Sequence, residues 1–139
     1  MIDQAYHAVT TPVRILIVDD HPGTASTLAR ILGQVDSPVE IFTAHTGPEA
    51  LALVGDGVVD IIIADYRMPG MNGLQLIEKV KSNRTAVHTI LITAYDSSRL
   101  AATARVLEVD DYVVKPIQPE KIRAIVNRAL MNLRQPGVA

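Results

Sequence analysis

The sequence of 139 residues contains no cysteine. Disulfide bonds, thiolate metal sites and cysteine nucleophiles are therefore excluded. Four histidines, at positions 7, 21, 45 and 88, show no metal-ligand spacing of the His-x-x-x-His kind. We therefore expect the histidine side chains to be solvated or packed, and not bound to a metal.

Long apolar runs are also missing. The longest apolar segments are much shorter than the roughly 20 residues that a membrane-spanning helix needs, and residues 1–12 lack the basic start and apolar stretch of a signal peptide. We therefore expect a cytoplasmic protein without membrane contact. The formal net charge of −2 argues against direct nucleic-acid binding, although it leaves room for a local basic patch.

The sequence contains no internal repeat. It also contains no glycine-rich phosphate loop, since neither Gly-x-Gly-x-x-Gly nor Gly-x-x-x-x-Gly-Lys follows an apolar run. The apolar fraction of 48% and the charged fraction of 20% are ordinary for a globular protein. The length suits one domain with its own core. We assign residues 1–12 to an N-terminal tail, 13–134 to the domain, and 135–139 to a C-terminal tail or the start of a linker.

The most informative segment covers residues 61–73, with the sequence IIIADYRMPGMNG. Apolar residues without alternation predict a strand buried on both faces, as in a parallel sheet covered by helices. This strand ends at Asp65, and residues 68–70 turn the chain because proline and glycine do not continue a strand. Asn72 can cap a helix that begins near Gly73. Asp65 is therefore predicted at the strand edge where open α/β sheets bind ligands.

Similar units repeat along the chain. Apolar runs predict strands at residues 14–18, 39–44, 61–65, 88–93 and 112–114, and the charge within 39–44 suits an edge strand. Helical periodicity and capping residues predict helices over residues 25–35, 46–55, 72–82, 97–107 and 119–133. Five strands alternating with five helices indicate an α/β fold: a parallel sheet with right-handed crossovers and helices on both faces.

Polar residues stand at the ends of four of the predicted strands: Asp19 and Asp20, then Asp65, Thr93 and Lys115. Since parallel strands lie about 4.8 Å apart and end at one edge, we expect these side chains to converge. Clustered carboxylates raise one another's pKa unless a cation lies between them. Carboxylates without histidine or cysteine favour a hard cation, and Mg²⁺ is the natural candidate. The alternative, that these acids only cap helices or face solvent, is less consistent with the matching positions of Thr93 and Lys115.

With a metal in place, the Asp65 carboxylate can act as a nucleophile towards phosphorus. Phosphoryl transfer depends mainly on positioning and on neutralising charge. The Lys115 ammonium suits one phosphoryl oxygen, and the Thr93 hydroxyl suits another.

Four motifs carry a family resemblance: residues 17–21 (IVDDH), 65–73 (DYRMPGMNG), 92–94 (ITA) and 111–116 (DYVVKP). In this order they resemble the response-regulator receiver domain of two-component signalling, over about residues 13–134. The resemblance implies a flavodoxin-like, doubly wound five-stranded sheet with strand order 2-1-3-4-5. It also implies a signalling switch that assists its own phosphorylation and slow dephosphorylation, and not an enzyme.

The resemblance assigns roles to individual residues. Asp65 would accept the phosphoryl group from a sensor histidine kinase or a phosphotransfer protein. Mg²⁺ would be held by Asp20, by Asp19 (often through water), by Asp65 and by the carbonyl of Arg67. Lys115 and Thr93 would bind the phosphoryl oxygens.

Two further implications concern the switch and the last loop. Tyr112 would turn inward when Thr93 moves, which changes the surface presented to a partner or output module. The peptide bond before Pro116 would be cis. The sequence identifies neither the kinase nor the effector.

Arg67 and Tyr95 each lie two residues after a site residue, Asp65 and Thr93 respectively. We expect both side chains to flank the route by which water reaches the phosphoryl group, and so to lengthen the phosphorylated state. The alternative is that both are exposed loop residues without a kinetic role.

Two other functions are compatible with part of the pattern. Hydrolases of the haloacid-dehalogenase type also use an aspartyl nucleophile, but they place a second acid two residues later, where this chain has Arg67. A receiver-like domain that binds partners without phosphorylation is the closer alternative. Such domains usually lose an acidic residue or the lysine, and this chain keeps Asp19, Asp20, Asp65 and Lys115.

Overall fold

A computed structural model describes residues 11–57, 59–83 and 86–133, so the predicted tails lie outside the described residues except for Thr11 and Pro12. The sheet has five parallel strands in the order β2-β1-β3-β4-β5. This order confirms the predicted fold class. The strands are β1 (Val13–Val18), β2 (Val39–Ala44), β3 (Ile61–Asp65), β4 (His88–Thr93) and β5 (Asp111–Val114).

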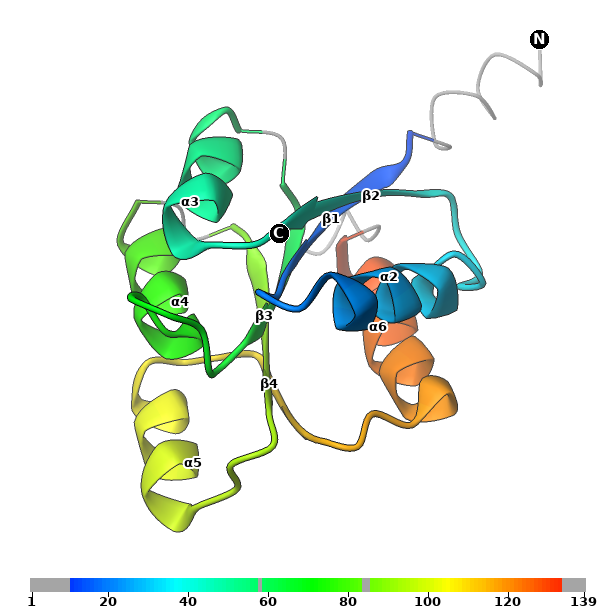
Figure 1. Cartoon of the computed structure of the whole chain (residues 1–139). Coiled ribbons are helices and arrows are strands. Elements are labelled where there is room, and N and C mark those ends of the chain that lie inside the picture. Colours follow the sequence, from blue (N-terminus) through cyan, green and yellow to red (C-terminus); the bar gives the residue numbers. More distant parts are fainter. Residues whose placement is uncertain (1–10, 58, 84–85, 134–139) are drawn as a thin grey trace, which may run out of the picture.

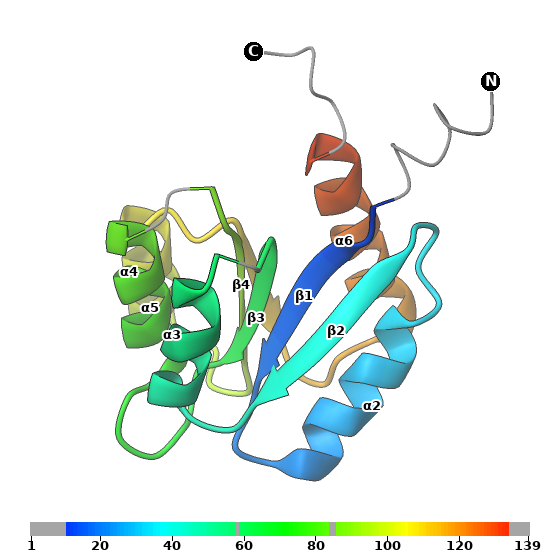
Figure 2. The ribbon, with the colours of Figure 1, turned by 90° about the horizontal axis from the view of Figure 1, so that it is seen from above.

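Helices cover both faces of the sheet, as Figures 1 and 2 show from two directions. In the described part of the chain they are α2 (Pro22–Leu32), α3 (Gly47–Gly55), α4 (Gly73–Asn83), α5 (Ser98–Val106) and α6 (Pro119–Leu133). The helices α2 and α6 lie on one face, and α3, α4 and α5 lie on the other. None of these described helices combines the length and the hydropathy that crossing a bilayer requires.

The central strands are apolar on both faces because each face supports its own helix layer. In β1, Ile15 and Ile17 belong to the cluster beneath α2 and α6. The alternate residues Leu16 and Val18 belong to the cluster beneath α3, α4 and α5. All four are at most 1% exposed, which explains why the strand shows no alternation of apolar and polar residues.

Strand β2 lies at one edge of the sheet. Its charged residue Glu40 is exposed and accepts a hydrogen bond of 2.8 Å from Arg14 Nε on the neighbouring strand. The edge position predicted from this charge is therefore confirmed.

Side-chain caps set the beginnings of three helices, at the residues the sequence indicated. The Thr46 hydroxyl accepts a hydrogen bond from the backbone N–H of Glu49 at 3.2 Å, and Ser97 caps α5 in the same way. At α4, Asn72 and Gln75 each accept a bond from the other's backbone N–H, at 2.8 and 2.9 Å. This reciprocal pair is the capping-box arrangement.

Helix α2 differs from its prediction at both ends. It begins at Pro22, which occupies the first helical position, and it ends at Leu32 instead of Val35. Beyond Gly33 the backbone tightens into three-residue turns, with the N–H of Val35 bonded to the carbonyl of Leu32 at 3.4 Å. Val35 still packs against the core from this turn, so its apolar side chain continues the helical spacing although the helix has already ended.

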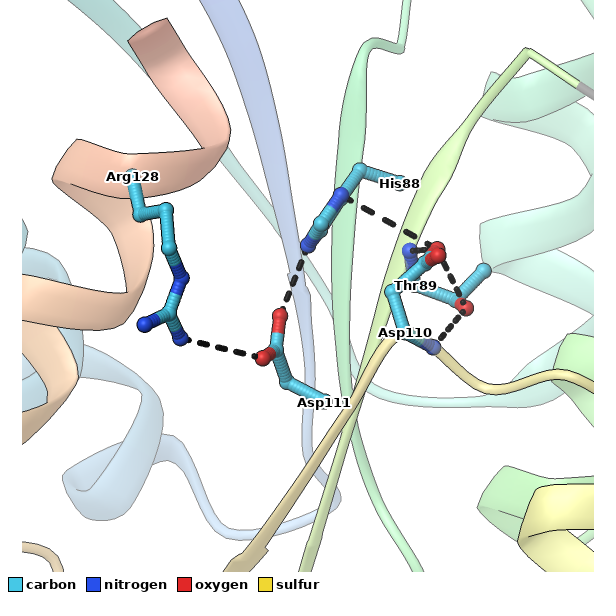
Figure 3. Close-up of polar contacts among 5 residues, drawn as sticks. All are labelled: His88, Thr89, Asp110, Asp111 and Arg128. Carbon is cyan, nitrogen blue, oxygen red and sulfur yellow. Dashed lines mark hydrogen bonds and ion pairs between the residues drawn. The ribbon is translucent and has the colours of Figure 1, made fainter. Parts of the chain in front are cut away.

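A polar network joins β4, β5 and α6 at the end of the sheet where these strands begin (Figure 3). His88 Nε2 lies 2.7 Å from Asp111 Oδ2, and Arg128 approaches the other Asp111 oxygen at 3.5 Å. The Asp110 carboxylate accepts bonds from the backbone N–H and the hydroxyl of Thr89, at 2.8 and 3.1 Å. The network fixes the short edge strand β5 far from the end of the sheet where Asp65 lies.

Candidate functional site

The register of the sheet brings the predicted residues to one edge. Val18 of β1 pairs with Ala64 of β3, so the next residues, Asp19 and Asp65, stand side by side. Thr93 is the last residue of the neighbouring strand β4, and Lys115 follows β5. The structure therefore brings together all the strand-end residues that the sequence indicated.

The carboxylates form a tight cluster. One oxygen each from Asp19, Asp20 and Asp65, together with a ring nitrogen of His21, lie within 4.8 Å of one another. Asp19 and Asp65 are buried, at 4% and 7% exposure. His21 has no partner at histidine-pair spacing in the sequence, and its place directly after two acids is the signal that indicates this contact.

One buried oxygen in the cluster lacks a hydrogen-bond partner within the described residues, namely Oδ1 of Asp20. His21 Nδ1 lies 3.2 Å from it, but not in hydrogen-bonding geometry. A buried polar atom without a partner is destabilising by about 1–3 kcal/mol. The donor set therefore fits a cation that takes carboxylate oxygens, with Asp19, Asp20 and Asp65 as the residues that would hold it.

Lys115 supplies the positive charge at the site. Its Nζ lies 3.2 Å from Asp65 Oδ1, and its backbone N–H bonds to the carbonyl of Thr93 at 2.8 Å. The peptide bond between Lys115 and Pro116 is cis. Because β4 lies between β3 and β5, the long Lys115 side chain reaches past a strand to meet Asp65.

The Asp65 carboxyl has a pKa above its ordinary value. Burial is the main cause, and the nearby charge of Asp19, with a smaller contribution from Asp20, acts in the same direction. Lys115 opposes both effects. One lysine therefore does not compensate for the burial and crowding of the carboxylates, which is the situation that a bound cation relieves.

The Thr93 hydroxyl is buried and is engaged within its own loop. It accepts a hydrogen bond from the backbone N–H of Tyr95 at 2.8 Å and lies 3.2 Å from the carbonyl of the same residue. Tyr112, the other residue assigned to the switch, is half-buried, and its hydroxyl lies 3.4 Å from Asp96 Oδ1. In this conformation Thr93 is therefore positioned next to the site without pointing a free hydroxyl into it.

Arg67 and Tyr95 meet at the mouth of the site. The Arg67 guanidinium carbon lies 5.1 Å from the centre of the Tyr95 ring, within the range of a cation–π contact. Both residues line a shallow hollow of about 640 Å³ that also includes Asp20 and His21. Arg67 and Tyr95 therefore both lie beside the acidic cluster, and their effect on the lifetime of the phosphorylated state stays a prediction.

The loop after Asp65 is held by a close contact with Gly73. A Cβ atom at Gly73 would collide with the backbone oxygen of Asp65 and would lie 2.9 Å from its carbonyl carbon. The N–H of Gly73 also bonds to the carbonyl of Tyr66 at 2.9 Å. The start of α4 therefore lies directly against the end of β3, and it positions the carboxylate.

Comparisons with known proteins agree with this geometry. The family model of the response regulator receiver domain matches residues 15–127. The chain is 35% identical over 117 residues to the regulatory protein AtoC of Escherichia coli K12, covering 84% of this chain and 25% of AtoC. It is 35% identical over 118 residues to the positive alginate biosynthesis regulatory protein of Pseudomonas aeruginosa, covering 84% of this chain and 47% of that protein.

Solved structures show the same fold. A CheY-like response regulator receiver domain protein from Methanospirillum hungatei JF-1 is similar with a TM-score of 0.79 and 29% identity, covering 88% of this chain and 96% of that one. By contrast, the chain spans less than half the length of the two curated relatives described above.

Proposed function

The chain belongs to the response regulator receiver domain family, and from this premise we propose that it is a phosphoacceptor switch of a two-component system. Asp65 accepts a phosphoryl group from the phosphohistidine of a sensor histidine kinase or a phosphotransfer protein, in the cytoplasm and in the presence of Mg²⁺. One observation carries the proposal. It is the contact of 3.2 Å between Lys115 and Asp65 inside an acidic cluster with an unpartnered Asp20 oxygen.

In the transfer step, an oxygen of the Asp65 carboxylate attacks phosphorus in line with the phosphorus–nitrogen bond of the donor. The oxygen–phosphorus bond forms, the phosphorus–nitrogen bond breaks, and the leaving imidazole nitrogen keeps the electron pair and takes up a proton. The reaction needs orientation and charge neutralisation more than covalent chemistry from other groups.

The remaining residues bind and orient. Asp20, Asp19, Asp65 and the carbonyl of Arg67 are the groups that would hold Mg²⁺, which when bound neutralises negative charge on the carboxylates and the phosphoryl group. Lys115 already lies beside one Asp65 oxygen, where its ammonium group can contact a phosphoryl oxygen.

The switch is carried by Thr93 and Tyr112. A phosphoryl group on Asp65 offers the Thr93 hydroxyl a charged acceptor in place of the Tyr95 carbonyl, 3.2 Å away. Movement of Thr93 leaves space for Tyr112, which turns inward and gives up its weak contact with Asp96. The face formed by α5 and β5 changes as a result, and an effector reads this change.

The direct test is phosphorylation by acetyl phosphate with Mg²⁺, followed by phosphate-affinity electrophoresis. We expect the wild type to incorporate phosphate and Asp65→Asn to incorporate none, because the amide keeps the shape of the side chain and loses its nucleophilic charge. The matched control is Asp56→Asn at the exposed end of α3, which should behave as the wild type. Incorporation into Asp65→Asn at the wild-type rate would refute the assignment.

A further inference from the structure

We propose that His21 is a nitrogen ligand of the cation at the acidic cluster, so that the site prefers a first-row transition-metal cation to Mg²⁺. This inference rests on the proposed function, because it concerns the same site. It adds a ligand that the carboxylate set alone does not include.

His21 lies at the N-cap position, directly before α2. This position favours Ser, Thr, Asp or Asn because their side chains accept a hydrogen bond from the first helical turn. The His21 side chain makes no such bond. His21 is therefore a poor N-cap for α2, and its ring makes a different contact.

The ring nitrogen faces the carboxylates instead. His21 Nδ1 lies 3.2 Å from Asp20 Oδ1 and 3.5 Å from Asp19 Oδ1. The His21 backbone N–H also donates a hydrogen bond to Asp19 Oδ1 at 2.9 Å, which holds the residue close to the acids. The imidazole nitrogen thus lies next to the one buried oxygen of the cluster that has no hydrogen-bond partner in the described residues.

The spacing of these atoms suits a common metal ion. An octahedral ion with ligands at about 2.1 Å holds neighbouring ligand atoms about 3 Å apart and opposite ones about 4.2 Å apart. The four donor atoms of Asp19, Asp20, His21 and Asp65 lie within 4.8 Å of one another. The His21 side chain is 72% exposed, so its ring can adjust without displacing the core.

A nitrogen donor changes which ion such a site prefers. Three carboxylates alone favour Mg²⁺, whereas imidazole suits later first-row divalent ions, whose affinity for mixed nitrogen and oxygen ligands rises from Mn²⁺ towards Cu²⁺. Magnesium gains little from an imidazole because it prefers oxygen ligands and keeps its water. The contribution of His21 should therefore be visible as a difference between the two kinds of ion.

Isothermal titration calorimetry with Mg²⁺ and with Co²⁺ measures this difference. The variant is His21→Ser, because serine is a better helix cap and should keep or raise the melting temperature of the metal-free protein. We expect His21→Ser to weaken Co²⁺ binding roughly tenfold or more, since even outer-shell partners of a metal site contribute about 10- to 100-fold. Mg²⁺ binding should change less than about threefold.

The matched control is His45→Ser. His45 is also an exposed histidine near the site, with Nδ1 3.1 Å from the backbone carbonyl of Asp19, but it is not in the donor cluster. Its replacement should leave the ratio of Co²⁺ to Mg²⁺ affinity unchanged. A second readout is the proton NMR spectrum of the Co²⁺-loaded protein. A strongly shifted imidazole N–H signal should be present in the wild type and in His45→Ser, and absent from His21→Ser.

The outcomes separate the two proposals. If Co²⁺ affinity is unchanged in His21→Ser, or falls by the same factor as Mg²⁺ affinity, His21 is not a ligand and the inference is overturned, while the proposed function stands. If the wild type binds neither ion, both proposals fail. A selective loss of Co²⁺ affinity together with loss of the shifted N–H signal supports the inference.

Discussion

At the scale of single residues, Asp65 holds a charge that its surroundings disfavour. Burial raises the pKa of Asp65, the neighbouring Asp19 and Asp20 raise it further, and only Lys115 lowers it. Between the ordinary carboxyl pKa and this raised value, the folded protein binds more protons than the unfolded chain. The free energy of unfolding of the metal-free protein therefore falls as the pH rises through that window.

The fall in the free energy of unfolding with rising pH leads to a stability prediction for Asp65→Asn. Without the titrating carboxyl, the decrease in stability with rising pH should be smaller, and the metal-free variant should be more stable than wild type at neutral pH by about 1 kcal/mol, a usual scale for one substitution. Urea unfolding with a chelator present, followed from about pH 4 to about pH 7, measures both effects. An unchanged slope in the variant would contradict the electrostatic account of Asp65, and Asp56→Asn serves as the control.

Two residues at the mouth of the site should set the lifetime of the phosphorylated state. Arg67 and Tyr95 are in contact, and water must approach the phosphorus in line to hydrolyse the acyl phosphate. We expect Arg67→Ala and Tyr95→Ala each to speed the decay of phosphate-loaded protein by roughly fivefold, because each variant removes a group that screens the site from water. A roughly fivefold change in rate corresponds to about 1 kcal/mol of activation free energy. The decay is followed by electrophoresis after removal of the phosphate donor.

The control for this series is Arg105→Ala, an exposed arginine in the last turn of α5. Its decay should match the wild type. If Arg67→Ala and Tyr95→Ala also decay no faster than the wild type, the lifetime is set elsewhere.

At the scale of elements, the junction between β3 and α4 determines where Asp65 stands. Gly73→Ala would force the first turn of α4 away from the Asp65 backbone. We expect a loss of about 1–3 kcal/mol of stability, the usual effect of overpacking a close contact, together with slower phosphorylation because the carboxylate moves. Thermal unfolding and acetyl phosphate labelling measure the two effects.

Gly55 provides the control for Gly73. In Gly55→Ala, at the end of α3, the added Cβ meets no atom within 4 Å. Since alanine favours helix over glycine by up to about 1 kcal/mol, this variant should be as stable as the wild type or more so, with normal phosphorylation. Equal destabilisation by both substitutions would mean that the contact with Asp65 has no special role.

At the scale of the whole molecule, we expect the acidic cluster to couple cation binding to the stability of the fold. The three carboxylates come from the ends of β1 and β3 and meet only in the folded protein. Mg²⁺ should therefore raise the free energy of unfolding, by about 2.7 kcal/mol at a concentration of 100 times Kd. Melting curves with Mg²⁺ and with chelator measure the shift.

The variant for this prediction is Asp20→Asn. It removes one charge from the cluster, so the metal-free protein should melt at a higher temperature while the Mg²⁺-dependent shift becomes smaller. Asp56→Asn, outside the cluster, should keep the full shift. A full Mg²⁺ shift in Asp20→Asn would show that Asp20 is not a ligand.

The fold and the place of the site follow from local patterns in the chain. Apolar runs such as residues 61–64 specify buried strands, and caps such as Asn72 specify helix beginnings, because both depend on residues close in sequence. Parallel strands end at a common edge, so acids at or directly after those ends, such as Asp65 and Asp19, are certain to be neighbours once the sheet forms.

Other features were decided only by the tertiary structure. The direction of the Thr93 hydroxyl, the reach of Lys115 past β4, the approach of His21 to the acids, and the end of α2 at Leu32 appear only in the folded molecule. Each is decided by packing and by competing hydrogen-bond partners in three dimensions. The order of residues alone does not determine which of those hydrogen-bond partners a side chain takes. Several partners are equally close along the chain, and others come within reach only when the helices and strands assemble.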